Sequence, residues 1–275
     1  MNKRMRLATF LLAVALVSGC AASYVTPSGG ASMAEFAGLG EQIDGDISKH
    51  FETRPAAAFP VHIAVVRIQD SGYRTKTQHG FGHGRYSVVT TRDIETDEAF
   101  ERLRKLPDVN GVAPIGRMLV PVNANTIKDL RIPAAKLHAD MVLVYSVNTS
   151  LYIDGKQLGP LSMISLGLIP NQKAHVTATV AGMLVDVRTG YIYGTTEASD
   201  TQEQRTTVWA TEMAIEKARA KAETNAFEGF VGEFEELWDG VVSGYKGKAL
   251  ARRSGDVHRE SYYTLQLGDT PETTE

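Results

Sequence analysis

Two histidines, His79 and His83, bracket Gly80-Phe81-Gly82 and give the spacing His-x-x-x-His. On a helix this spacing would place both imidazoles on one face, where they could ligate zinc. Glycines at 80, 82 and 84 oppose a helix here, and no acid or further histidine lies close in the sequence. A glycine-rich loop is the favoured interpretation, and a zinc site made by His79 and His83 is the alternative.

Acidic residues stand at the ends or starts of three expected strands: Asp70, Asp140 and Asp186. Acids at strand ends can be catalytic in α/β enzymes, although acids that only cap solvated strand ends are the more common case. The hydrolase signatures Gly-x-Ser-x-Gly and His-Glu-x-x-His are absent from the sequence. We therefore predict a non-enzymatic protein with no catalytic residue and no cofactor.

Cys20 is the only cysteine of the chain and follows Val17-Ser18-Gly19. Before it stand three cations and an apolar run over residues 7–17, which is shorter than the ~20 apolar residues of a spanning helix. This order is typical of an export signal. The ending closely resembles the lipobox of bacterial lipoproteins, and the resemblance implies cleavage before Cys20 and acylation of that cysteine. A plain secretory signal with a chance cysteine is the alternative.

Composition limits the class of partner. Removal of the 19 residues that precede Cys20 from the 275 leaves 256, enough for one large domain or two small ones. The chain has 29 basic and 32 acidic residues, and Lys3, Arg4 and Arg6 belong to the signal, so the remainder has a net charge of −6. A mildly acidic surface argues against nucleic acid as a partner, since phosphate binding requires a basic surface.

Hydrophobic patterns predict strands over 61–68, 86–92, 112–120 and 140–147, and a hairpin of 176–186 with 191–199 around the turn 187–190. Helices are expected after Thr96 and after Asn125, the second kinked or split by Pro133. A long helix is expected from about Thr206 to Trp238. This order predicts an α/β fold with a mixed sheet of five or six strands, packed helices and a long C-terminal helix.

The predicted organisation has four parts. Residues 1–19 form the signal peptide, and residues 20–35 the acylated cysteine with a flexible spacer rich in small and polar residues. Residues 36–245 form a single α/β domain, and residues 246–275 a polar, mobile tail.

Two stretches resemble a family of envelope proteins. Residues 139–149 (ADMVLVYSVNT) and 182–194 (GMLVDVRTGYIYG) are similar to the pattern of the curli-secretion lipoprotein and TolB amino-terminal-domain type. The resemblance covers about residues 61–240 in element order and implies a periplasmic-type domain.

An apolar run at 161–169 interrupts the region between two expected strands. It is either a covered part of the core or a surface for a partner, a second copy or a membrane. Its candidate contact residues are Leu161, Met163, Ile164, Leu166, Leu168 and Ile169.

Together these features predict a protein of the bacterial outer membrane, anchored by acyl chains at Cys20, with its domain in the periplasm. The predicted role is a non-enzymatic binding or assembly module that contacts an envelope protein or copies of itself. A component of an outer-membrane secretion or assembly complex and an anchored metal-dependent enzyme are the alternatives.

Overall fold

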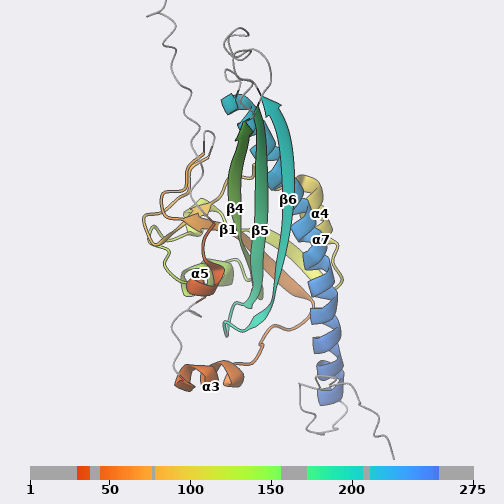
Figure 1. Cartoon of the computed structure of the whole chain (residues 1–275). Helices are drawn as coiled ribbons and strands as arrows, with labels where there is room; N and C mark the ends of the chain where they lie inside the picture. The colour runs from red at the N-terminus through yellow and green to blue at the C-terminus, as the bar shows by residue number, and fades with distance from the viewer. Residues whose placement is uncertain (1–29, 38–43, 76–77, 156–171, 207–210, 254–275) are drawn as a thin grey trace, which may run out of the picture.

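The computed structural model describes residues 30–37, 44–75, 78–155, 172–206 and 211–253. Its centre is a six-stranded mixed sheet in the order β2-β1-β4-β5-β6, with β3 also paired to β1 (Figure 1). The strands are β1 (Val61–Asp70), β2 (Tyr86–Val89), β3 (Val109–Pro114), β4 (Met141–Gly155), β5 (Gln172–Asp186) and β6 (Ile192–Thr206). The predicted fold class is confirmed.

Strand direction divides the sheet into two parts. β1 runs parallel to β3 and β4 and antiparallel to the short β2. β4, β5 and β6 form an antiparallel meander of three 15-residue strands. The predicted hairpin is therefore confirmed, and its strands are longer than their apolar portions indicate.

The helices are α2 (Met33–Phe36), α3 (Asp44–Glu52), α4 (Asp97–Arg104), α5 (Ile127–Lys136) and α7 (Thr211–Arg253), with a 3₁₀ turn at Arg117–Leu119. α4 and α7 lie on one face of the sheet, whereas α2 and α5 contribute to the core on the other (Figure 1). Among the described residues, no helix is both long and apolar enough to cross a membrane.

The larger core lies between the sheet and α7. Side chains of alternate residues of β1, β4 and β5 meet an aromatic stripe of the helix. That stripe is formed by Phe227, Phe230, Phe234 and Trp238. Full burial of such a side chain stabilises a fold by ~1.5–3 kcal/mol, so this layer dominates the attachment of α7.

The second core covers only part of the opposite face. Leu130 and Ala134 of α5 pack there, and Phe36 of α2 meets Tyr86 edge-on with ring centroids 4.8 Å apart. Farther along β4, β5 and β6 this face carries polar side chains joined across the strands: Thr177 Oγ1 lies 2.8 Å from Thr201 Oγ1, and Thr179 Oγ1 lies 2.7 Å from Ser199 Oγ.

The starts of α4 and α5 agree with the sequence patterns to within one residue, whereas α7 begins at Thr211 and the predicted start, Thr206, is instead the last residue of β6. The Thr96 hydroxyl accepts a hydrogen bond of 3.1 Å from the amide of Ala99, as expected of an N-cap. The N-cap of α5 is Thr126 rather than the predicted Asn125, and the carboxylate of Asp129 accepts from the Thr126 amide. α5 continues through Pro133 as one element, so the prediction of a split is wrong.

Two predicted boundaries are wrong for identifiable reasons. The expected strand over 112–120 is instead β3 over 109–114, because the chain turns into a 3₁₀ helix at Arg117–Leu119. The long helix does not end near Trp238, since Val241 and Val242 are buried and carry it past Gly240. Its end at Arg253 lies within the segment predicted to be a tail.

The folded part of the chain includes residues assigned to the spacer. Gly30 forms a bridge with Gln69 of β1, and the Ala31 amide donates to Ser146 Oγ at 2.7 Å. The chain is thus attached to the sheet from Gly30 onward within the described part.

Candidate functional site

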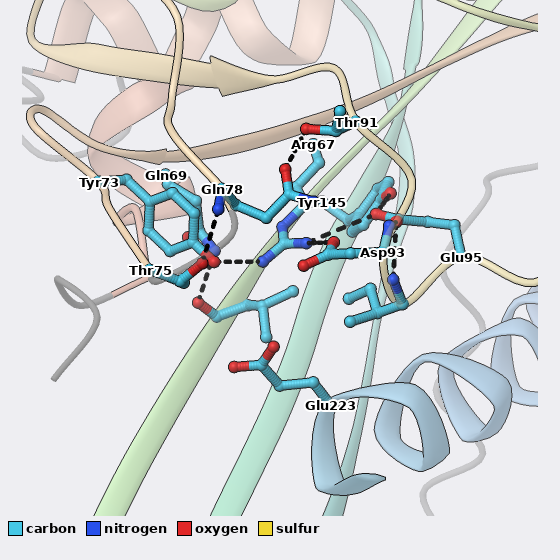
Figure 2. Close-up of polar contacts among 12 residues, drawn as sticks. Arg67, Gln69, Tyr73, Thr75, Gln78, Thr91, Asp93, Glu95, Tyr145 and Glu223 are labelled. Carbon is cyan, nitrogen blue, oxygen red and sulfur yellow. Dashed lines mark hydrogen bonds and ion pairs between the residues drawn. The ribbon is translucent and has the colours of Figure 1, made fainter. Parts of the chain in front are cut away.

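A buried polar cluster surrounds Arg67, which follows Val61, Ile63 and Val65 on the α7 side of β1 (Figure 2). We call Arg67, Tyr73, Asp93, Glu95 and Tyr145 the Arg67 cluster. The Arg67 side chain is only 1% exposed. A charge is almost never buried so completely unless it is paired, so its partners determine what the cluster can do.

The guanidinium of Arg67 is held from three directions. Nη1 lies 2.9 Å from Asp93 Oδ1 and 3.7 Å from Glu95 Oε1. Nη2 donates to the hydroxyl of Tyr73 at 2.9 Å, and the guanidinium carbon lies 5.4 Å from the centroid of the Tyr73 ring. Nε has no hydrogen-bond partner among the described residues.

Glu95 connects the cluster to β4. Its Oε1 accepts a hydrogen bond of 2.5 Å from the hydroxyl of Tyr145, and its Oε2 accepts from the amides of Asp93 and Ile94. The carboxylate therefore joins β4 to the loop that precedes α4.

Burial and neighbouring charges determine the protonation states of Arg67 and Tyr145 in the Arg67 cluster. Burial alone would lower the pKa of Arg67, but the charges of Glu95 and Asp93 outweigh this effect and raise it above its ordinary value. Burial raises the pKa of the Tyr145 hydroxyl well above 10.0, and the adjacent Glu95 carboxylate raises it further. Arg67 thus stays a cation and Tyr145 a neutral donor, so neither supplies a base for catalysis.

Glu223, which Figure 2 shows near the Arg67 cluster, belongs to a second ion-pair group on α7. Arg219 pairs with Glu223 and, at 2.6 Å, with Glu216, and it is only 3% exposed. Glu223 also accepts a hydrogen bond of 2.7 Å from the Thr149 hydroxyl of β4. The hydrogen bond between Thr149 and Glu223 therefore attaches α7 to the sheet in the part of the helix that precedes the aromatic stripe.

The third polar centre is Asp186, the last residue of β5, which has no exposed surface. Its carboxylate accepts hydrogen bonds from five donors in two separate segments. These donors are the amides of Ala56, Ala57, Arg188 and Thr189 and the hydroxyl of Tyr193.

These contacts explain the Asp-x-x-Thr-Gly sequence of the turn. Gly190 has φ +79°, a conformation that favours glycine, and its amide donates to the backbone oxygen of Asp186. Burial by itself would raise the pKa of Asp186, but hydrogen bonds from Thr189, Ala56, Tyr193 and Ala57 lower it below 3.8. Asp186 is thus an ionised structural acceptor.

The three strand-end acids do not form one site. Asp70 ends β1, whereas Asp140 precedes β4, which runs parallel to β1, so these two residues lie at opposite ends of β1. Asp140 lies at the same end as Asp186, where its Oδ2 accepts from the His62 amide at 3.0 Å.

His79 and His83 lie in a loop rather than on a helix, as the glycines predicted. His79 pairs with Arg74 in an isolated bridge, and the His83 amide donates to Val122 O at 2.7 Å. Both histidines are exposed, and no group of three or more potential metal ligands occurs among the described residues. Cys20 and the apolar candidates of 161–169 lie outside the described residues.

The sequence reasoning missed the Arg67 cluster. The sequence did contain one indication, the arginine at position 67 inside the apolar strand Val61–Asp70. A buried arginine requires an acidic or polar partner, but the pattern of β1 does not show which residue that partner is. Asp93 and Glu95 occupy a loop more than 20 residues farther along the chain.

Comparison with known proteins adds little to this geometry. No protein-family model matches the chain, and no curated protein matches it. Among solved structures, a "putative lipoprotein" from Caulobacter crescentus CB15 is similar over 42% of this chain and 80% of its own, with 18% identity and a TM-score of 0.24. This similarity is too low to carry an argument, and the resemblance to the curli-secretion and TolB type is not confirmed.

Proposed function

We propose that this chain is a lipid-anchored protein of the bacterial outer membrane whose α/β domain acts in the periplasm as a non-enzymatic binding or assembly module. The observation that carries the proposal is the sequence Val17-Ser18-Gly19-Cys20 at the end of a cationic and apolar leader. Ala21, rather than an aspartate, follows the cysteine, and by analogy with lipoprotein sorting this favours the outer membrane.

The internal polar centres support a role that does not depend on chemistry. Glu223 joins the sheet to α7, Arg67 joins it to a loop, and Asp186 joins it to residues 56–57. Side chains used in this way hold the domain together, which leaves its surfaces as the features that a partner could contact.

The attachment at Gly30 limits where the domain can lie. Ten peptide steps separate Cys20 from Gly30, and a fully extended chain spans at most ~3.5 Å per residue. The point at which the chain joins the sheet, beside Gln69 and Ser146, therefore lies within ~35 Å of the anchoring cysteine. The tether therefore keeps this side of the domain close to the membrane.

The anchor is tested by replacing the modified atom. Cys20→Ala in the full-length chain should abolish incorporation of a labelled fatty acid and the mass of the acyl chains, and should stop the protein from fractionating with the outer membrane. Ser18→Ala is the matched control, because it keeps a small residue before the cysteine. An unchanged mass and membrane fraction for Cys20→Ala would refute the anchor.

The non-enzymatic role is tested on the purified full-length protein. Cross-linking in cells followed by purification should recover one envelope protein, or a second copy of the chain, in constant proportion. Stoichiometric zinc in the purified protein, lost in His79→Ala/His83→Ala, would instead establish the metal-dependent alternative.

A further inference from the structure

The glycine-rich loop that precedes β2 packs against the loop that precedes α5. The amide of His83 donates to Val122 O at 2.7 Å, so the two loops run side by side. Glycine permits this close approach, because a Cβ at Gly84 would lie 2.4 Å from Ala124 O. The exposed side chains of both loops therefore share one surface.

This surface combines cations with exposed apolar side chains. We call Arg85, Arg117, Met118 and Val122 the Arg117 patch. The guanidinium carbon of Arg117 lies 4.3 Å from the centroid of the Phe81 ring, and Arg85 is exposed. Val122 is 50% exposed and Met118 is 96% exposed. The Met118 side chain thus buries almost none of its surface against the described part of the chain.

The Arg117 patch is basic although the chain as a whole is acidic. Residues 71–92 contain four lysines and arginines and residues 109–128 contain two, and neither segment contains an aspartate or glutamate. Asp70 and Asp129 adjoin these segments, but Asp70 is half-buried at the end of β1 and the Asp129 carboxylate caps α5. The exposed charge of the two loops is therefore positive.

The Arg117 patch lies on the side of the domain that the tether holds near the membrane. Gly30 bridges Gln69 of β1, and Gln69 is paired with Ser87 of β2. Phe81 in turn bridges Val88 at the outer edge of β2. Hydrogen-bonded strands lie ~4.8 Å apart, so three such steps place the Phe81 backbone ~15 Å from the end of the tether. This distance is shorter than the ~35 Å that the tether can span.

We propose that the Arg117 patch rests on the anionic phospholipid headgroups of the bilayer that holds the acyl chains, with Met118 inserted among those headgroups. Cations beside exposed apolar side chains are typical of a surface that binds an anionic membrane. An acidic protein would also attract the cations, but the tether keeps the bilayer at a high effective concentration beside this surface. The inference rests on the proposed lipid anchor and adds which face of the domain the bilayer contacts.

The contact is tested on the acylated protein, purified from membranes and reconstituted in lipid vesicles. Met118→Cys, labelled with a polarity-sensitive fluorophore, supplies the one free thiol of the chain, because Cys20 is acylated. In vesicles of phosphatidylglycerol and phosphatidylcholine, the label should emit at shorter wavelength and be quenched by brominated lipid. Met213→Cys is the matched control, since Met213 is 74% exposed at the start of α7 and its label should remain in water.

The role of charge is tested in the labelled Met118→Cys protein. Arg85→Gln/Arg117→Gln should lower the ratio of bilayer-bound to detached domain ~25-fold, because each cation near an anionic surface contributes about fivefold. Vesicles of phosphatidylcholine alone and high salt should give the same loss. Arg92→Gln/Arg104→Gln is the control for net charge and should have no effect, because both arginines lie over Phe100 on the α7 face.

Three results would overturn the inference: a Met118→Cys label that stays in water in anionic vesicles, equal quenching at Met118 and Met213, or no effect of Arg85→Gln/Arg117→Gln. An acidic protein as the true occupant would give the first result, since these vesicles contain no other protein. Failure of the anchor is recognised separately, because a protein without acyl chains would have a reactive Cys20 thiol in the wild-type chain. An anchored protein that floats with the vesicles while its Met118→Cys label stays in water would refute the Arg117 patch alone.

Discussion

The carboxylate of Asp186 accepts a hydrogen bond of 2.9 Å from the hydroxyl of Tyr193, across the turn between β5 and β6. Leu184 pairs with Gly194 and Val185 with Ile192, so Tyr193 is the extra residue of a bulge. Bulges change the direction of a side chain relative to its strand. At this bulge the Tyr193 hydroxyl reaches the Asp186 carboxylate, which also accepts hydrogen bonds from the amides of Ala56 and Ala57.

Loss of the Asp186 carboxylate should destabilise the domain strongly. Asp186→Ala leaves four backbone amides without their acceptor, and we expect the free energy of unfolding to fall by ~3 kcal/mol. Tyr193→Phe removes one of the five donors and should cost ~1 kcal/mol. Urea denaturation measures both, and equal losses for the two variants would contradict the shared-acceptor arrangement.

The same carboxylate should make stability depend on pH in the acid range. The pKa of Asp186 is lower in the folded protein than its ordinary value of 3.8, so its contribution is fully present above that value. The contribution is lost as the pH falls through the folded pKa. The stability difference between wild type and Asp186→Asn should therefore be constant at neutral pH and shrink below about pH 4. Denaturation across this range checks it, and a difference that persists at about pH 2 would argue against a lowered pKa.

The sequence predicted those elements whose own residues show their surroundings, such as an apolar strand that is buried or a turn that needs glycine. β1 is almost continuously apolar and is buried on both faces, and the turn at Gly190 requires its glycine. These features could be recognised because the residues themselves carry the requirement.

Elements that depend on distant contacts were missed. α7 continues beyond Gly240 because Val241 and Val242 are buried and Tyr245 meets Tyr191 and Tyr193 across the hairpin. The polar ends of β5 and β6 are strands because their backbones hydrogen-bond to the adjacent strands of the sheet. Their composition alone does not indicate a strand. The partners of Arg67 lie in a loop that no periodicity marks.

Two glycines should respond in opposite directions to alanine. A Cβ at Gly182 would lie 2.7 Å from Phe230 Cζ and 2.9 Å from Val144 O, so Gly182→Ala forces α7 away from β5 and should cost ~1–3 kcal/mol. Gly240 lies in α7 with no atom within 4 Å of its Cβ position, so Gly240→Ala should stabilise the fold by ~1 kcal/mol.

Thermal unfolding of the two variants under identical conditions measures both effects. The comparison is matched, because each substitution adds one methyl group. A Gly182→Ala variant as stable as wild type would mean that Phe230 does not pack against β5 as closely as described.

Arg67 provides a test of whether the buried cluster is structural. Arg67→Met leaves Asp93 and Glu95 without the cation that faces them, and removal of one partner from a buried pair costs ~3–5 kcal/mol. Arg102→Met is the matched control, since Arg102 is 40% exposed and its loss from exposed pairs with Glu228 and Glu235 should cost at most ~1 kcal/mol.

A double-mutant cycle then assigns the loss to charge. Glu95→Gln keeps an oxygen that can accept from Tyr145 but removes the negative charge that faces Arg67. Glu95→Gln should therefore destabilise the wild-type chain yet cost less, or even stabilise, when Arg67→Met is already present. We expect a coupling free energy of ~1–3 kcal/mol between the two positions. Strict additivity would show that Arg67 acts through packing of its aliphatic stem, and that the carboxylates of the Arg67 cluster are stabilised by their other donors.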